Sequence, residues 1–467
     1  MGALFRKEVL AHLLSYRAPL AFALVLCLTV GGALVFRADH RARLDAFNRA
    51  EALRMDALSR QCESQMPLAA ALSLLDQRVA MRPSPLAFVA EGRERELPNV
   101  AVLNAFRVAE VRREQGGNPL VPAFDAPDWV LIATIALSFF AVVLTFDGMS
   151  GEREDGTLRL VLSNSVPRWR VVASKALAAS AVLMAPVAVG GVLQVVIIAA
   201  GGTLELGAGE AARLGVALLL VYLFVLSFVL LGLACSLLCS SSGSALVIAL
   251  LIWSVLVVII PRSSVLLSSA FPGVDTADEV LQRKEQEQRL AADAFQERHP
   301  GEANRWVSGH WTSGESLELA FAVHRVANEV QSQWRARQVR QVELARRLGM
   351  VSPAGWLAAG LERAAGTGLS HYAVFLARAE EYRASLEALL RARYPGNPCD
   401  APGGDEGRRA RIDAVKLSVS DIPAWRGAET TTSDWAPGAA LCGGAFVLLD
   451  GALLLAVMFL ATQYDVR

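Results

Sequence analysis

The sequence predicts an all-α, polytopic membrane protein with six transmembrane helices and a mainly helical extracytoplasmic domain. Its 467 residues are 54% hydrophobic and 19% charged, whereas soluble chains average about 45–50% apolar and about 25% charged residues. Only 7% of the residues are aromatic, so Leu, Val and Ala supply the excess apolarity. The charge balance of 45 basic and 45 acidic side chains argues against a nucleic-acid partner, which would favour a basic excess.

Six apolar stretches are long enough to cross a bilayer, which takes about 20 residues of helix. They cover residues 19–36, 129–147, 175–200, 214–238, 245–261 and 438–463. No charged residue occurs from Leu214 to Pro261, and the Ser-rich turn at 239–244 divides this run into two spans.

The sixth span is interrupted by one charge, Asp450. An ionisable group at mid-membrane costs about 2.5–3.5 kcal/mol on insertion scales. We therefore expect Asp450 to face the bundle interior as a candidate intramembrane functional residue. The other interpretation is a shifted span that leaves this carboxylate near one interface.

Lys and Arg residues in short loops predict the orientation, because such residues stay on the cytoplasmic side. Residues 1–18, which we expect to form a cytoplasmic interfacial helix, contain Arg6, Lys7 and Arg17, and four arginines occupy the loop 148–174. Only Arg213 lies between the third and fourth spans. Both termini are therefore predicted to be cytoplasmic, and the hydrophilic segments 37–128 and 262–437 to be extracytoplasmic. Both segments are expected to be largely helical, because neither shows the alternating pattern of a sheet domain.

Two of the six cysteines, Cys62 and Cys399, fall in the outer segments, one in each. An oxidising compartment lets disulfides persist, so we predict that these two pair and join the segments into one domain. Two unpaired thiols are the alternative.

Signatures of an enzyme are absent from the sequence. It contains no G-x-x-x-x-G-K-[ST], H-E-x-x-H, C-x-x-C or G-x-S-x-G pattern, and its six histidines are scattered. We therefore expect no catalytic residue, no metal site and no cofactor bound by this chain.

The loop after the second span has a distinctive composition. Asp147 ends the span, and Glu152, Glu154, Gly156, Thr157 and Leu158 follow it. An acidic cap and a Gly turn before an apolar run predict a short amphipathic helix against the inner membrane surface. A solvated connector is the other interpretation.

This pattern resembles the ABC-2-type transporter permeases, in which an acidic residue, E-x-E-x-G-T-L, a short helix, Pro-x-Arg and a Lys follow the second span. Pro167, Arg168 and Lys175 match its later positions, and the Arg6-Lys7-Glu8 run is similar to the family's entry helix. The outer run 351–357 and the large insertions resemble bacterial members such as gliding-motility and copper-enzyme-maturation permeases.

The resemblance implies a type V exporter-like fold and a non-catalytic permease subunit of an ATP-driven transporter. It implies a place in the bacterial cytoplasmic (inner) membrane, a second permease subunit in a homo- or heterodimer, and a separate ATPase that binds ATP and Mg. The residues implied to couple to the ATPase are Asp147, Glu152, Glu154, Gly156, Thr157 and Leu158.

Export or membrane extraction of an unidentified substrate is the function that this resemblance favours. A membrane sensor or assembly scaffold that binds an extracytoplasmic protein partner is an alternative. A secondary transporter would require charged or broken helices at the midplane, for which Asp450 is the only good candidate.

Overall fold

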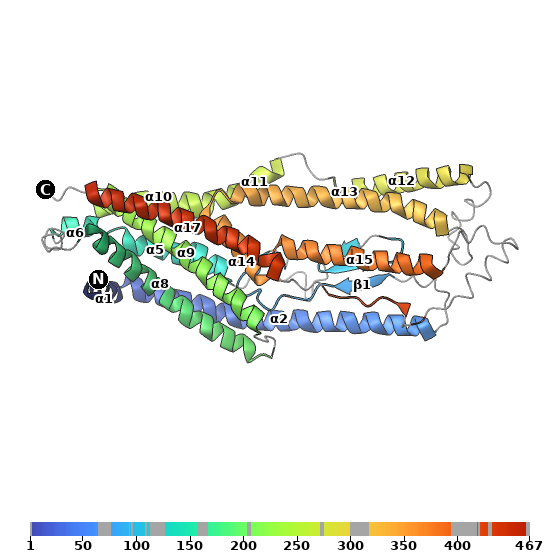
Figure 1. The fold of residues 1–467 in the computed structure, drawn as a ribbon, viewed down its shortest axis with the longest axis horizontal. Helices are drawn as coiled ribbons and strands as arrows, with labels where there is room; N and C mark the ends of the chain where they lie inside the picture. Colours follow the sequence, from blue (N-terminus) through green and yellow to red (C-terminus); the bar gives the residue numbers. More distant parts are fainter. Residues whose placement is uncertain are drawn as a thin grey trace.

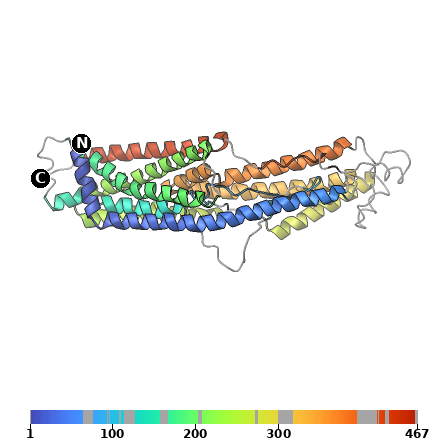
Figure 2. The same cartoon turned by 90° about the horizontal axis from the view of Figure 1, so that it is seen from below.

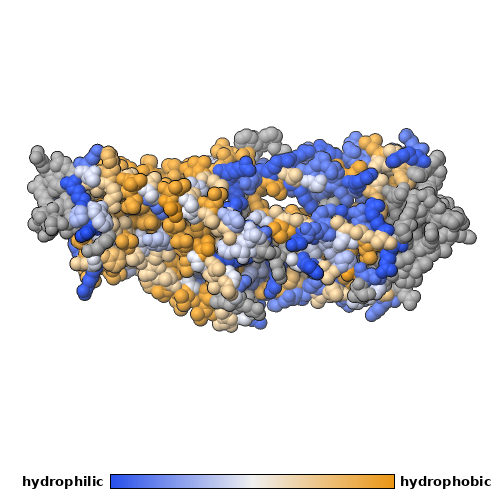
Figure 3. Space-filling view, in the orientation of Figure 1, coloured by the Kyte–Doolittle hydropathy of each residue, from blue (hydrophilic) through white to orange (hydrophobic). Residues whose placement is uncertain are grey.

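The computed structural model describes residues 2–63, 76–92, 94, 97–107, 110–112, 127–156, 167–202, 207–270, 275–298, 317–393, 418, 421–427 and 432–463. The molecule is elongated, with an apolar helical bundle at one end and a hydrophilic domain at the other (Figure 1). Apolar side chains cover the bundle, and charged side chains gather on the hydrophilic domain (Figure 3). Both chain termini lie at the free end of the bundle, which we call the terminal end. We call the opposite end of the bundle, where it meets the hydrophilic domain, the junction.

Six helical segments of the described chain are long and apolar enough to cross a membrane, which confirms the predicted number of spans. They follow a first helix, α1 (Gly2–Leu14), that runs across the terminal end (Figure 2). The helices that build the six spans are α2 (Arg17–Glu63), α4 (Trp129–Leu131) with α5 (Ser138–Thr145), α8 (Arg168–Ala199), α9 (Ala208–Leu238), α10 (Ser242–Trp253) with α11 (Ile260–Ala270), and α17 (Thr432–Gln463).

Two of the spans contain a π-helical segment, η1 (Ile132–Leu137) in the second and η2 (Ser254–Ile259) in the fifth. The two segments are joined where η1 ends and η2 begins, because Trp253 Nε1 donates to Ser138 Oγ over 2.7 Å. A π-helical turn leaves backbone groups with altered partners, and this side-chain bond fixes the two irregular regions against each other.

The hydrophilic domain combines the second half of α2 with elements from both outer segments. α2 is one unbroken helix of 47 residues, so its first half crosses the bundle and its second half lies beside the domain (Figure 1). The other elements of the domain are the strands β1 (Gln77–Ala80), β2 (Val100–Leu103) and β3 (Glu110–Arg112) and the helices α12 (Ala277–Arg298), α13 (Leu317–Gly349) and α15 (Leu369–Arg393).

The small sheet corrects the expectation that the first outer segment has no sheet pattern. Its strands pair antiparallel in the order β1-β2-β3, with Gln77 opposite Leu103 and Val100 opposite Arg112. The strands have three or four residues, and every side chain of β2 is buried. Alternation of apolar and polar residues marks only strands with one solvated face, so the central strand β2, which is buried on both faces, left no such signal. The domain is otherwise helical, as predicted.

The two outer segments share one hydrophobic core. Val79 and Leu103 of the sheet pack in the same cluster as Phe375, Tyr382 and Leu386 of α15. Cys62, near the end of α2, packs against the edge of this cluster. Cys399 lies outside the described residues, and no disulfide partner of Cys62 lies within them. The pairing of these two cysteines stays a prediction.

The junction is closed by a short helix of the second outer segment, α14 (Pro353–Ala365), which packs into the bundle. Leu357 and Leu361 of α14 are fully buried in the same core as the spans. Gly360 lies so close to α9 and α17 that an added Cβ would stand 2.8 Å from Leu220 Cδ1 and 3.3 Å from Cys442 Cβ. The missing side chain of Gly360 therefore lets Leu220 and Cys442 pack directly against α14, and a larger residue would displace the Leu220 side chain.

Charged side chains also gather at the junction. Arg43 of α2 forms ion pairs with Asp39 and with Glu91, the latter over 2.5 Å. Asp128 caps the second span by accepting from the Leu131 N–H over 2.8 Å. Burial raises the pKa of Asp128 to about 6, because desolvation disfavours its charged form.

Glu94 is the most deeply buried carboxyl of this group. Its Oε1 accepts from the Ser84 N–H over 3.0 Å, and its Oε2 has no partner among the described residues. Burial raises the pKa of Glu94 to about 7, although the Ser84 N–H and Arg43 lower it, and Glu91 and Asp39 contribute a smaller increase. The neutral carboxyl is therefore the form that the fold favours.

Glu94→Gln is expected to remove a pH dependence of stability. The folded pKa of about 7 lies above the ordinary value of 4.5, so the stability that the neutral group contributes is complete below about pH 4.5. It is lost as pH rises through 7. Between these two limits the free energy of unfolding of the wild type falls by about 3 kcal/mol. Thermal unfolding in detergent should show Glu94→Gln close to wild type at pH 4.5 and more stable than wild type at pH 8.

The same substitution at the exposed Glu285 of α12 provides the control and should leave the wild-type pH profile of stability unchanged. A wild-type pH profile for Glu94→Gln would contradict the burial argument.

Candidate functional site

The predicted coupling loop leaves the second span at the terminal end and begins with the one-turn helix α6 (Ser150–Glu154). Ser236 of α9 holds its start, because Ser236 Oγ accepts from the N–H groups of Met149 and Ser150 over 2.9 and 3.0 Å. Asp147 accepts from Arg17 of α2 over 2.6 Å. The loop is therefore attached to two spans before its acidic residues are reached.

A buried lysine occupies the centre of the site. Lys175 of α8 donates to Glu152 Oε1 over 2.9 Å and to Glu8 Oε2 over 3.1 Å, and its side chain is 6% exposed. A buried ammonium group between two carboxylates balances part of its desolvation cost through both ion pairs. These contacts connect α6, α8 and α1.

Lys7 lies at the solvent side of the same cluster. Its Nζ is 3.4 Å from Glu152 Oε1 and 3.5 Å from Glu8 Oε1. Burial alone would lower the pKa of Lys7, but attraction and hydrogen bonds to Glu152 and Glu8 outweigh burial and raise it. Lys7 therefore stays charged across the physiological range and completes a cluster of two cations and two anions.

Glu154 connects the loop to the fifth span, in addition to the contacts with α2, α8 and α9. Its two carboxylate oxygens accept from the backbone N–H of Ser242 over 3.0 Å and from Ser242 Oγ over 2.6 Å. Ser242 begins α10, and a carboxylate that satisfies a free N–H at a helix start also interacts favourably with the helix dipole. This exposed contact links the loop to the fifth span, and so does the contact of Ser150 Oγ with Ser242 Oγ over 3.3 Å.

Gly156 follows α6 in the left-handed conformation, with φ +70°. Its N–H donates to Arg153 O over 3.1 Å, which closes the helix. Residues other than glycine pay a steric cost in this region. The left-handed backbone therefore explains why the motif has a glycine at this position.

Of the predicted coupling residues, Asp147, Glu152, Glu154 and Gly156 lie together at the terminal end, whereas Thr157 and Leu158 lie outside the described residues. The short amphipathic helix expected after them lies outside too. Pro167 precedes α8 as expected from the motif, and Arg168 donates to the Ala461 and Thr462 carbonyls over 3.0 and 2.8 Å at the end of α17.

Three partners of the site went unrecognised in the sequence: Glu8 as a ligand of Lys175, Arg17 as the partner of Asp147, and Ser236 as the anchor of α6. The charges that flank the apolar runs are visible in the sequence, but nothing local shows which of them pair with each other. No local pattern distinguishes Ser236 from the other serines of its span.

Asp450 lies apart from this site, in the interior of the bundle. It is 7% exposed, and Ser227 Oγ donates to its Oδ1 over 2.5 Å. Its Oδ2 is buried with no hydrogen-bond partner among the described residues. Its role as a functional residue stays a prediction.

This geometry defines a class of protein, a helical membrane protein with six spans, both termini at one end and a charged loop that contacts four of the spans. Residues 3–370 match the family model described as ABC-2 family transporter protein. The chain therefore belongs to the ABC-2 family of transporter membrane proteins. No curated protein matches it.

Lys175→Met is expected to destabilise the terminal end, because it removes the buried cation between Glu8 and Glu152 and leaves them only the more exposed Lys7. Breaking such a buried pair costs about 3 kcal/mol, and the melting temperature should fall accordingly. The double variant Lys175→Met/Glu152→Gln should recover part of the loss, which a double-mutant cycle measures. Equal melting temperatures for wild type and Lys175→Met would show that the cluster contributes nothing.

Asp450→Leu is expected to raise thermal stability by about 1–2 kcal/mol, because it removes a buried oxygen without a partner. Ser227 keeps an acceptor, since its Oγ also donates to Leu223 O. Asp450→Asn keeps a polar group at the site and should show no such gain. A transport rate that is unchanged in the stabilised Asp450→Leu protein would remove Asp450 from the functional residues.

Proposed function

We propose that this chain is the permease subunit of an ATP-driven exporter, located in the bacterial cytoplasmic membrane with both termini in the cytoplasm. A separate ABC ATPase binds ATP and Mg, and a second permease subunit, identical or different, completes the dimer. The permease carries out no bond chemistry. It moves an unidentified substrate outward or extracts it from the membrane toward the hydrophilic domain.

The observation that carries this proposal is the position of α6 and its contacts. α6 lies at the same end of the bundle as both termini, opposite the hydrophilic domain (Figure 1). The basic residues Arg6, Lys7 and Arg17 belong to this end of the chain, which supports a cytoplasmic assignment. α1 runs across this end and exposes Leu10, Leu13 and Leu14, as an interfacial helix does.

The contacts of the loop supply a route for coupling. Through Glu152 and Lys175 a displacement of α6 reaches α8 and α1, and through Glu154 and Ser242 it reaches α10. An ATPase that binds this loop differently in its ATP-bound and free states would shift the equilibrium between two arrangements of the spans.

Charge reversal and helix-breaking variants of the loop test the proposal in the full chain, co-purified with the ABC ATPase that binds it. Glu154→Arg removes the contact to Ser242, and Gly156→Pro cannot adopt the φ of +70°. Losing a charge-assisted hydrogen bond corresponds to about tenfold in an equilibrium constant, so Glu154→Arg should reduce the stimulation of ATP turnover by the permease about tenfold. Gly156→Pro should also reduce it, because the end of α6 must change its backbone conformation, and insertion should stay intact in both variants.

Glu285→Arg provides the control, because this exposed residue of α12 undergoes the same charge reversal far from the terminal end. Its turnover should match wild type. Normal coupled turnover in Glu154→Arg and Gly156→Pro would contradict the coupling role. Failure of any ABC ATPase to bind the chain would favour the alternative function, a non-transporting sensor or scaffold for an extracytoplasmic protein partner.

A further inference from the structure

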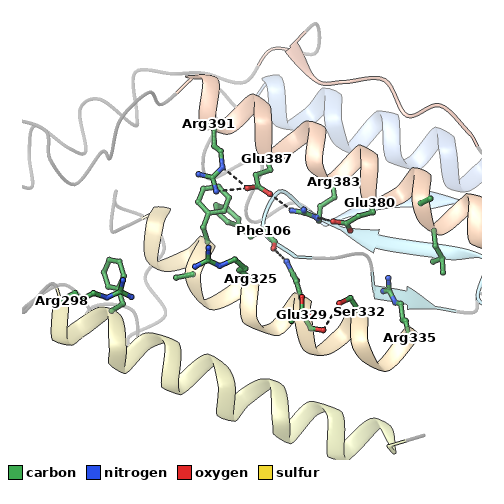
Figure 4. Close-up of a pocket in the computed structure, with 16 residues that line it drawn as sticks. Phe106, Arg298, Arg325, Glu329, Ser332, Arg335, Glu380, Arg383, Glu387 and Arg391 are labelled. Atoms are coloured by element: carbon green, nitrogen blue, oxygen red, sulfur yellow. Dashed lines mark hydrogen bonds and ion pairs between the residues drawn. The ribbon is translucent and has the colours of Figure 1, made fainter. Parts of the chain in front are cut away.

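A cavity of about 810 Å³ lies in the hydrophilic domain, away from the coupling site (Figure 4). α13 and α15 form its two long walls, and the last turn of α12 closes one side. Phe106, after β2, lies between the walls and packs on Phe321 with ring centroids 4.7 Å apart. The volume is within the range of small-molecule sites, about 300–1,000 Å³.

The lining of the cavity carries a net positive charge of two. Five arginines line it, Arg298, Arg325, Arg335, Arg383 and Arg391. Three glutamates line it, Glu329, Glu380 and Glu387.

The charges on the α15 wall are already neutralised in pairs. Glu387 accepts from Arg383 and Arg391, each over 2.9 Å, and Glu380 accepts from Arg383 over 2.6 Å (Figure 4). Arg391 is held in place a second way, because its guanidinium lies 4.1 Å from the centre of the Phe321 ring. This wall is ordered and nearly neutral.

The excess positive charge is therefore on the opposite side. Arg325 of α13 and Arg298 of α12 are exposed, and neither has a carboxylate partner among the described residues. The only hydrogen bond of the Arg298 guanidinium to the described chain goes to the Ala294 carbonyl. Two guanidinium groups without carboxylates can bind a phosphate or carboxylate in bidentate geometry.

Apolar surface lies next to these cations. The half-buried side chains of Phe321 and Leu376 face the cavity, and Phe106 and Phe295, each 4% exposed, lie beneath this lining. A free inorganic anion would leave this surface in contact with water. A neutral apolar molecule would leave the arginines without a counter-charge.

We propose that this cavity binds an anionic amphiphile, with its phosphate or carboxylate head on Arg298 and Arg325 and its apolar part against Phe321 and Leu376. The size and the two-part lining favour this ligand over a folded protein segment. The site goes beyond the permease function proposed above and does not depend on it, because it forms without the ATPase.

Calorimetric titration of the full chain in phosphatidylcholine nanodiscs tests the proposal, with empty nanodiscs subtracted and octyl phosphate as the probe. Octyl phosphate should bind, and both octanol and inorganic phosphate should bind at least about tenfold more weakly, since each lacks one of the two contacts. Arg325→Glu and Arg298→Glu should each weaken octyl phosphate about tenfold or more.

Arg340→Glu is the matched control, because Arg340 is exposed on the same helix as Arg325 and does not line the cavity. Its affinity should equal that of wild type, and unchanged melting temperatures should show that all three variants fold. Equal binding of octyl phosphate and octanol would overturn the proposal, as would equal affinities of Arg325→Glu and Arg340→Glu.

A second titration, in nanodiscs that contain phosphatidic acid, distinguishes a bilayer lipid from a soluble amphiphile as the ligand. Competition with octyl phosphate identifies a bilayer lipid as the ligand, and undiminished binding identifies a soluble amphiphile. Both results agree with a ligand that has an anionic head and an apolar part.

Discussion

The unbroken helix α2 is the constraint on which the rest of the structure depends. At 47 residues it is about 70 Å long, so it passes through the whole bundle and continues along the hydrophilic domain. Arg17 near its start binds Asp147, and Arg43 binds Glu91 at the junction. The two parts of the molecule are therefore held on one rigid element rather than joined by a linker.

Close backbone packing fixes α2 against the bundle between these two ion pairs. An added Cβ on Gly190 of α8 would stand 2.3 Å from Thr29 Oγ1. Small residues allow this approach in membranes, where the hydrophobic effect does not drive helices together. Thr29 Oγ1 donates to Val25 O over 2.9 Å, so its hydroxyl is satisfied within the helix. Packing therefore holds the middle of the span, and charges hold its ends.

The bundle is closed differently at its two ends. At the terminal end polar contacts hold α6, through the buried bonds to Ser236, the ion pair of Glu152 with Lys175 and the exposed bonds of Glu154 to Ser242. At the junction α14 is packed as part of the core, and Thr367 Oγ1 and Ser84 Oγ join the two outer segments through bonds to Ala90 O and Ala365 O.

The sequence by itself determined the membrane class, the six spans and the helical character of the outer segments, because each depends on local length and apolarity. It also located the loop of Glu152, Glu154 and Gly156, whose turn chemistry is local. Only the tertiary structure decided that Lys175 binds Glu8, that α14 enters the bundle core, and that short buried strands form a sheet. These features join residues far apart in the chain, and the free energy of such contacts depends on burial and distance, which the order of residues does not specify.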